Sequence, residues 1–530
     1  MPVTSVAVHA FPECKDIWTQ LDSTSQKQVL ALGSRIWDAP ENEVGESISK
    51  ELHELESRGV LVQEDGKWCF TLPQMLFFVQ SINLIDSLSL HSRTADELLH
   101  DLGELFWTAR PHSFRRHRDY QNLVSFVIAQ LVNEFDRLDL IELVVSVETM
   151  KQDFWQFYEP ICQALPILEL SIESFTTVLR DVANRVQGDL TDVRIYSATE
   201  YLGRFRPEFA FKLVDSFAAI EDWGTSGFLE KLLTGIAMAS PDYFDIIVAR
   251  SEAWLDSDIG NLCQAALYCL QNLILNGKLE PNRLLSRADS LASKSIDGFR
   301  HALSSVIAIL GASFEQCAEK CLNILQRLKE EGPLDQVAHG IAVALSQIRD
   351  NAAFDFKTSC LPLLTDVPIA NKVTIKKIGW LLYPIAHSCP GEVWKYLEGW
   401  ILAHQLEESI TEHNLFLSTV QNAYKCDPNL GSLVVTRWFA SPDLRLVEEA
   451  RSILRELKIH GFAAREINSM SPQTIMYITE KLLVGRLEST QMIWLCYNIL
   501  QKTSKIEELE DYFLRVLRYL ELSQQHQRAL

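Results

Sequence analysis

Proline recurs where new helical segments begin, and this punctuation limits the possible folds more than any other feature of the chain. From about residue 92 to residue 525 one amphipathic helical segment follows another, without a linker rich in glycine or serine. Proline suits the first turn of a helix because the amide there has no partner inside the helix. Eight of the 18 prolines stand at such positions: Pro207, Pro241, Pro281, Pro333, Pro390, Pro428, Pro442 and Pro472. The preceding serines Ser240, Ser441 and Ser471 are expected to act as N-caps.

These helical segments are expected to pack in pairs. In residues 261–275, for example, apolar side chains recur at i, i+4, i+7 and i+11, which is the spacing of one buried helical face. The gaps between the eight prolines run from 14 to 57 residues, too irregular for a tight repeat such as ankyrin. The sequence predicts an all-α, irregular HEAT- or armadillo-like solenoid with roughly ten helix pairs of about 40 residues each. A compact multi-helix domain is the alternative.

A different pattern occupies the N-terminal region. A first helix is expected to begin after Asp22 or Ser23, and residues 38–46 leave room for only a helical stub. A helix over residues 47–58 then runs into Gly59 and a predicted β-hairpin, in which an Asp65-Gly66 turn supplies the positive φ angles that a tight turn needs. We expect a winged-helix-like module over residues 1–91 and the solenoid over residues 92–530.

Composition and charge favour an acidic cytoplasmic protein. The chain has 49 Lys and Arg against 70 Asp and Glu, a net charge of −21, which repels nucleic acid unless positive charge is concentrated locally. Its 11 cysteines are scattered and odd in number, as expected for reduced, buried thiols. Residues 1–16 do not have the pattern of a signal peptide, and no run approaches the roughly 20 apolar residues needed to cross a bilayer.

One dense basic cluster interrupts this acidic background at residues 110–118. It contains the arginines Arg110, Arg115, Arg116 and Arg118 together with two histidines, His112 and His117. Such a cluster can bind a phosphate, an RNA or an acidic surface of a partner. Alternatively, it is a solvated loop between helices that pairs with the protein's own carboxylates.

The sequence contains no recognised catalytic motif, and we expect no enzyme activity, cofactor or metal. His117-Arg118-Asp119 matches the kinase catalytic-loop triplet, but the glycine-rich loop and the Asp-Phe-Gly motif are lacking. Nucleotide-binding and hydrolase signatures are lacking as well. Cys317 and Cys321 are predicted to be core thiols, because a metal site needs three or four ligands. The many aromatic residues, such as Trp394, Tyr396 and Trp400, are predicted to fill the core.

Residues 51–61, which read ELHELESRGVL, and residues 65–71, which read DGKWCFT, together resemble one known family. The resemblance is to the winged helix that follows the ATPase core in bacterial STAND-type signalling NTPases, where a helical-repeat sensor commonly comes next. About 20 residues precede the first expected helix, so no ATPase residue can be carried over. The resemblance implies a detached sensor or adaptor part, of the kind found in bacterial antiviral defence complexes.

Together these features predict a non-enzymatic cytoplasmic scaffold, adaptor or sensor subunit that binds other proteins within a multi-subunit complex. DNA reading by the module is disfavoured, because residues 46–58 contain two basic residues and four glutamates. One alternative is a nucleic-acid-associated regulator that uses the basic loop 110–118. A second alternative is an enzyme of unrecognised type, with a site assembled across several helices.

Overall fold

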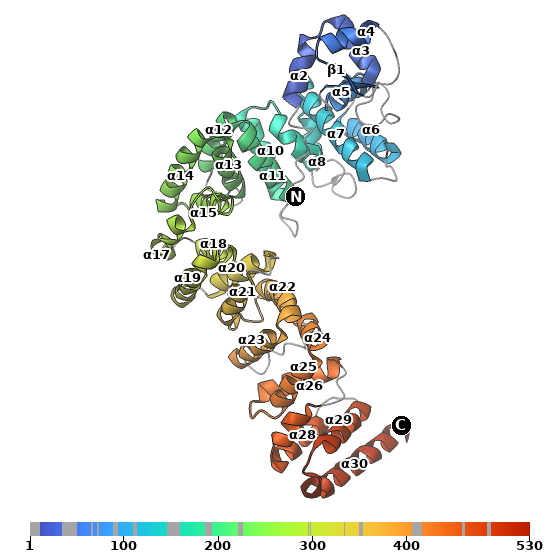
Figure 1. Ribbon diagram of the computed structural model, residues 1–530, viewed down its shortest axis with the longest axis vertical. Helices are drawn as coiled ribbons and strands as arrows, with labels where there is room; N and C mark the ends of the chain where they lie inside the picture. Colours follow the sequence, from blue (N-terminus) through green and yellow to red (C-terminus); the bar gives the residue numbers. More distant parts are fainter. Residues whose placement is uncertain are drawn as a thin grey trace. The chain divides into compact units, whose positions relative to one another are not determined.

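The computed structural model describes residues 11–33, 50–64, 67–71, 74–87, 94–109, 114–145, 160–185, 193–220, 226–294, 296, 298–332, 334–348, 353–404, 416–457, 462–484 and 489–529. Within these ranges it is an all-α helical-repeat fold with one β-hairpin near the N-terminus (Figure 1). The chain forms two compact units, Met1–Leu273 and Ile274–Leu530. Among the described residues, no helix is both long enough and apolar enough to span a membrane.

The first unit begins with the hairpin module and continues into helical repeats. Its module elements are α2 (Phe11–Gln20), α3 (Ser23–Gly33), α4 (Lys50–Ser57), β1 (Leu61–Glu64), β2 (Lys67–Phe70) and α5 (Met75–Ser87). They are followed by α6 (Ala95–Ala109), α7 (Phe114–Phe135), α8 (Asp139–Val145), η3 (Leu165–Ile167), α10 (Ile172–Arg185), α11 (Val193–Phe205), α12 (Pro207–Ala218), α13 (Ser226–Ala239), α14 (Pro241–Asp256) and α15 (Gly260–Leu275).

The hairpin has the predicted form. Strands β1 and β2 are antiparallel, with Leu61 opposite Phe70 and Glu64 opposite Lys67. Gly59 ends the preceding helix with a φ angle of 72°, in the left-handed region that glycine adopts at least cost. The predicted stub at 38–46 and the Asp65-Gly66 turn lie outside the described residues.

Sequence reasoning missed helix α2, which ties the module to the first repeats. Its Phe11 is buried and meets the rings of Phe78 on α5 and Phe126 on α7, with ring centroids 5.4 and 5.1 Å away. Gln130 on α7 donates a buried hydrogen bond of 2.8 Å to Ser81 on α5. The module and the helices that follow it therefore share one core, and the division at residues 91 and 92 stays a prediction.

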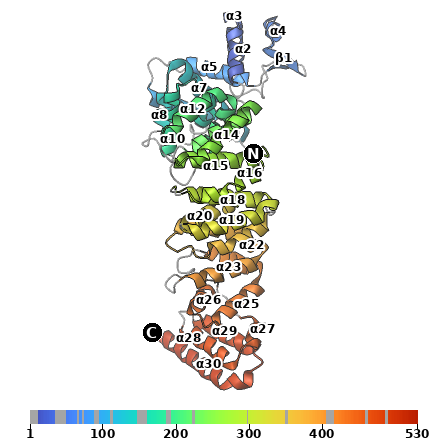
Figure 2. The same ribbon diagram turned by 90° about the vertical axis from the view of Figure 1, so that its left-hand side faces the viewer.

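The second unit contains the remaining helices, seen stacked in Figure 2. They are α16 (Pro281–Leu285), α17 (Ala288–Ala292), α18 (Phe299–Ser313), η5 (Glu315–Cys317), α19 (Ala318–Glu331), α20 (Leu334–Gln347), α21 (Phe354–Cys360), η7 (Leu361–Leu364), α22 (Lys372–Ser388), α23 (Pro390–Ala403), α24 (Leu417–Cys426), α25 (Pro428–Phe439), α26 (Leu444–Leu457), α27 (Ala464–Ser469), α28 (Pro472–Val484), α29 (Ser489–Lys502) and α30 (Ile506–Ala529).

Proline punctuation is confirmed at most of the predicted helix starts. Six of the eight prolines are the first residue of a helix: Pro207, Pro241, Pro281, Pro390, Pro428 and Pro472. Pro442 lies two residues before α26, and Pro333 is outside the described residues. Ser471 caps α28 by accepting a hydrogen bond from the amide of Thr474, whereas Ser240 makes no capping bond, contrary to prediction.

Side-chain hydrogen bonds join neighbouring repeats at separations of 32 to 41 residues. Tyr396 donates to the carbonyl of Leu364, Trp400 to that of Val367 and Asn261 to that of Ile220, at 3.1, 3.2 and 2.9 Å. The partners are 32, 33 and 41 residues apart. This spacing agrees with the predicted helix pairs of about 40 residues.

In the second unit, alternate helices form two layers. The first layer contains α18, α20, α22 and α24: His339 on α20 bonds Thr374 on α22 at 2.9 Å, and Asn422 on α24 donates to the carbonyl of Tyr383 on α22 at 3.1 Å. The second layer contains α19, α21 and α23. In Figure 1, α19 and α23 lie to the left of α22 and α24. The exposure of these helices differs: α18 is almost wholly buried, whereas α22 keeps several exposed residues.

Candidate interaction surface

The structure places the predicted basic cluster only in part. Arg110 lies outside the described residues, and Arg115, Arg116 and Arg118 fall within the first five residues of helix α7. The predicted loop is therefore helical from Phe114 onward. The same helix continues into a buried apolar stretch that includes Leu123, Phe126 and Val127, so the arginines form its first turns. The side chains of these arginines are not described, so anion or partner binding by the cluster stays a prediction.

The predicted core residues are buried. Trp394, Tyr396 and Trp400 on α23 are each at most 3% exposed. Cys317 and Cys321 are also buried, and burial raises the pKa of the Cys321 thiol to about 12, as expected for an unreactive core thiol. The ten cysteines whose side chains are described are free thiols, and of these Cys389 and Cys426 are exposed. Among the described residues, no group of His, Cys, Asp and Glu side chains is placed to hold a metal ion.

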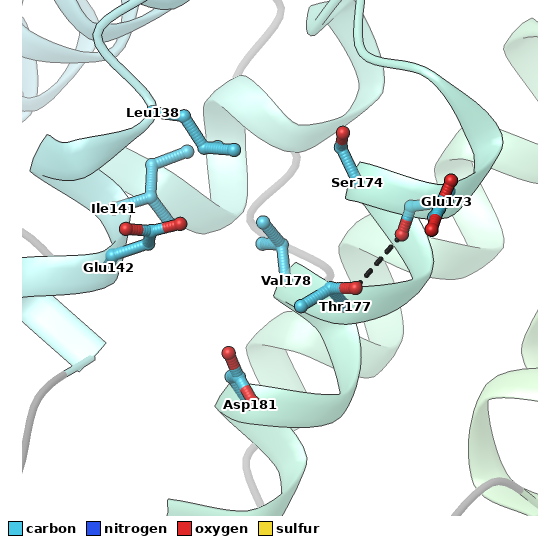
Figure 3. Close-up of a pocket in the computed structure, with 8 residues that line it drawn as sticks. All are labelled: Leu138, Ile141, Glu142, Glu173, Ser174, Thr177, Val178 and Asp181. Atoms are coloured by element: carbon cyan, nitrogen blue, oxygen red, sulfur yellow. Dashed lines mark hydrogen bonds between the residues drawn. The ribbon is translucent and has the colours of Figure 1, made fainter.

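A cleft of about 270 Å³ lies between α8 and α10 in the first unit (Figure 3). Figure 3 shows Leu138, Ile141 and Val178 facing one another across it. The remaining lining residues are Glu142, Glu173, Ser174, Thr177 and Asp181. The Thr177 hydroxyl donates to the carbonyl of Glu173 within its own helix at 3.0 Å. The cleft is therefore a small acidic groove over an apolar floor, and its described hydrogen bonding is that of an ordinary helix surface.

Half-buried charges in the first unit form a paired network. Lys231 lies 3.1 Å from Glu230 and 3.4 Å from Glu200, and Asn272 donates a hydrogen bond to Glu230. Burial raises the pKa of Glu230, because the charged form loses its hydration. Burial by itself lowers the pKa of Lys231, but the neighbouring Glu230 and Glu200 raise it overall. This network joins α11, α13 and α15, and its contacts are those of a structural ion pair.

Two histidines meet in the first layer of the second unit. The rings of His301 on α18 and His339 on α20 stack with centroids 4.9 Å apart. Burial and the neighbouring His339 lower the pKa of His301 to about 4, and burial and Lys377 lower the pKa of His339. Both rings are therefore neutral at pH 7, and the bond from His339 to Thr374 links two repeats.

Helix α22 presents an exposed stripe, which we call the α22 surface. Its members are Val373, Lys376, Lys377, Trp380 and Tyr383. Steps of three or four residues lead from Val373 to either lysine, from either lysine to Trp380 and from Trp380 to Tyr383, so these residues share one face of the helix. Val373 is 63% exposed, Trp380 51% and Tyr383 54%. The opposite face is buried and consists of Ile375, Ile378, Leu381, Leu382 and Ile385.

The two lysines of the α22 surface lie against its tryptophan. The ammonium nitrogen of Lys377 is 4.4 Å from the centroid of the Trp380 ring, and that of Lys376 is 5.2 Å away. These are cation–π distances, at which the negative face of the ring attracts the cation. The prediction that the aromatic residues fill the core is therefore wrong for Trp380 and Tyr383. The signal for their exposure was available, because both residues fall outside the Ile and Leu stripe of α22.

No protein-family model matches the chain, and no curated protein matches it in sequence. The resemblance of the hairpin region to STAND-type proteins accordingly stays a prediction.

Proposed function

We propose that the protein is a non-enzymatic scaffold, adaptor or sensor subunit that binds another protein through the α22 surface. The observation that carries this proposal is the half exposure of Trp380 and Tyr383 on a helix whose opposite face is buried in the repeat array. Grouped apolar surface of this kind marks interaction sites, and Trp and Tyr are the residues that most often contribute large shares of binding energy. A repeat array also exposes an extended surface for such contacts.

The described titratable groups support a binding role over a catalytic one. His301 and His339 are neutral and stacked, and the hydrogen bond of His339 goes to Thr374 of the next repeat. Glu230 and Lys231 neutralise each other between packed helices. Each of these groups thus has a partner that holds the fold together.

The N-terminal module supplies a second component of the proposal. Its hairpin resembles the winged helix of STAND-type proteins, which favours a sensor or adaptor part and makes bacterial defence complexes the first place to seek the partner. We place the protein in the cytoplasm, where its free cysteines remain reduced.

The test is capture of the partner by the tagged full chain from its native cell extract, at moderate and high salt, with identification by mass spectrometry. Wild type is compared with W380A/Y383A. The matched control is W494A/Y497A on α29, because those two side chains have the same types and spacing and are 53% and 45% exposed. We expect a stoichiometric protein that survives high salt, is lost from W380A/Y383A and is retained by the control.

Two results would contradict this proposal. If the tagged chain captures no protein, the proposed scaffold function is wrong. Capture of nucleic acid alone, lost at high salt and absent from R115A/R116A/R118A, would put the basic-cluster alternative in its place.

A further inference from the structure

We infer that the α22 surface recognises an acidic peptide segment that also carries apolar side chains, contributed by the partner protein. This inference rests on the proposed function and adds the chemistry of the partner. It is drawn from the distribution of charge over the first layer, the placement of the two lysines and the exposure of Val373.

The first layer is basic although the chain as a whole is acidic. Helices α18, α20, α22 and α24 contain one acidic residue, Asp335. Their Lys and Arg residues are Arg300, Lys372, Lys376, Lys377 and Lys425. The chain has 70 acidic and 49 basic residues, so a random set of four helices would carry more acids than bases. The local excess of positive charge is complementary to an acidic partner.

This positive charge is concentrated along α22 and continues to the end of α24. Lys372 and Lys376 are exposed and Lys377 is half-buried. At the other end of α22, the Sγ atom of Cys426 lies 3.5 Å from Nδ1 of His387, which brings the neighbouring exposed Lys425 to the same edge. Arg300 is different, because its Nη1 atom is buried. The lysines therefore form a basic strip beside the exposed rings.

The positive charges of Lys376 and Lys377 lie at the Trp380 ring, where a partner can reach them. Among the described carboxylates, none forms an ion pair with Lys376 or Lys377, whose ammonium groups lie over Trp380 instead. A glutamate or aspartate of a partner would pair with these ammonium groups at the edge of the ring. An apolar side chain of the same segment would then cover the ring itself, and both contacts gain from the exclusion of water.

A peptide fits this surface better than a nucleic acid strand. Trp380 and Tyr383 offer rings to a base as well as to a peptide, whereas Val373, which is 63% exposed, offers an aliphatic contact that suits an apolar side chain of a peptide. A nucleic acid carries a phosphate at every nucleotide, so a strand that extends beyond the basic strip meets the surface of a protein of net charge −21. A short acidic segment can place its few charges on the lysines alone.

The test uses fluorescence anisotropy with the full-length protein and three labelled probes. The first probe is a synthetic peptide of glutamate, leucine and phenylalanine, the second is the same peptide with lysine for each glutamate, and the third is oligodeoxythymidylate. We expect the acidic peptide alone to bind, with an affinity that is reduced but not abolished as salt is raised, because salt screens the lysines and not the apolar contact with the ring. W380A/Y383A and K376E/K377E should each weaken binding by about tenfold or more, the effect typical of an interface hot spot.

Matched controls separate this surface from general effects of charge and exposure. W494A/Y497A controls for the exposed aromatic pair, and K395E controls for the lysines, because Lys395 is exposed on α23 in the second layer. Both controls should leave the affinity for the acidic peptide within about twofold of wild type. Circular dichroism should show equal helix content in all variants.

Three outcomes would overturn the inference: no binding of the acidic peptide, equal binding of the basic peptide, or binding of oligodeoxythymidylate alone with loss in K376E/K377E. The failure of the inference is distinct from that of the proposed function. If W380A/Y383A loses a captured protein while the acidic peptide does not bind, the scaffold function stands and only the acidic chemistry is wrong.

Discussion

Helices α22 and α23 follow each other in the chain and carry the same kinds of aromatic side chain, yet they use them in opposite ways. On α23, the ring nitrogen of Trp400 donates to the carbonyl of Val367, and the Tyr396 hydroxyl donates to that of Leu364. Both rings are thus buried with their polar atoms satisfied. On α22, Trp380 and Tyr383 stay half exposed, and Trp380 meets lysines instead.

This difference shows what decides the place of an aromatic ring in a repeat array. A ring that lies on the inward stripe of its helix enters the core, and the polar atoms of Tyr396 and Trp400 reach backbone carbonyls of the preceding repeat. A ring off that stripe remains outside whatever its size. Exposed rings of this kind contribute little to folding, so their free energy of burial remains available for a partner.

The largest expected effect comes from truncating one tryptophan on each helix. W400A removes a fully buried ring and its hydrogen bond and should lower the free energy of unfolding by about 3–5 kcal/mol. W380A should change it by no more than about 0.5 kcal/mol. Urea unfolding of the full chain measures both. Equal losses would show that Trp380 belongs to the core and would end the comparison.

A second expected effect is a loss of stability at low pH, caused by His301 in the first layer. Burial holds the pKa of His301 at about 4, below its unfolded value of about 6.5, so the unfolded chain binds the proton first. Stability should therefore fall as the pH is lowered from about 6.5 to about 4, by at most about 3 kcal/mol.

Variants can assign this pH dependence to His301. H301F keeps the ring stack on His339 but removes the titrating group, so urea unfolding should show a smaller loss between pH 6.5 and pH 4. H53Q is the control, because His53 is an exposed residue of α4 in the other unit. An unchanged pH dependence in H301F would assign the loss to other groups.

A third expected effect compares a tightly packed glycine in the first layer with a loosely packed glycine in the second layer. A methyl group added at Gly340 on α20 would collide with the Ser304 hydroxyl and the His301 carbonyl on α18. G340A should therefore cost about 1–3 kcal/mol, as overpacking does. At Gly391 on α23 the nearest atom would lie 3.7 Å away, so G391A should be neutral or stabilising by up to about 1 kcal/mol. Thermal unfolding that gave equal melting temperatures would contradict this contrast.

The smallest expected effect comes from removing single hydroxyl groups. Y396F leaves the carbonyl of Leu364 without its side-chain donor and should cost about 1 kcal/mol. Y383F removes a hydroxyl from an exposed ring and should leave the melting temperature unchanged within error. A clear loss of stability in Y383F would reveal an intramolecular role for that hydroxyl.

The elements that could be predicted from sequence depend on local backbone chemistry. Pro207, Pro390 and Pro472 begin helices because their rings fix a helical φ angle and their missing amide hydrogen costs nothing in the first turn. Gly59 ends a helix because it alone adopts a positive φ angle cheaply. The repeat length of about 40 residues was taken from what is typical of HEAT- and armadillo-like helix pairs, because the spacing of the prolines is irregular.

One feature that sequence reasoning missed depends on distant residues. Helix α2 carries few apolar side chains, and its Phe11 is buried only because Phe78 and Phe126 come together in space. The α22 surface was missed for a different reason. The aromatic residues were assigned to the core as a class, although Trp380 and Tyr383 fall outside the Ile and Leu stripe of α22.

The ion pair between Lys15 on α2 and Glu169, which follows η3, bears on the order in which the chain folds during synthesis. Most of the bonds between repeats described above join residues 32 to 41 positions apart, so a repeat can close soon after its successor is made. Lys15 instead pairs with Glu169, 154 residues later, at 3.0 Å. At about 5–20 residues per second, Lys15 waits roughly 8–30 s for its partner to be translated. The N-terminal segment is thus made first, but its docking is completed only after several helices have formed.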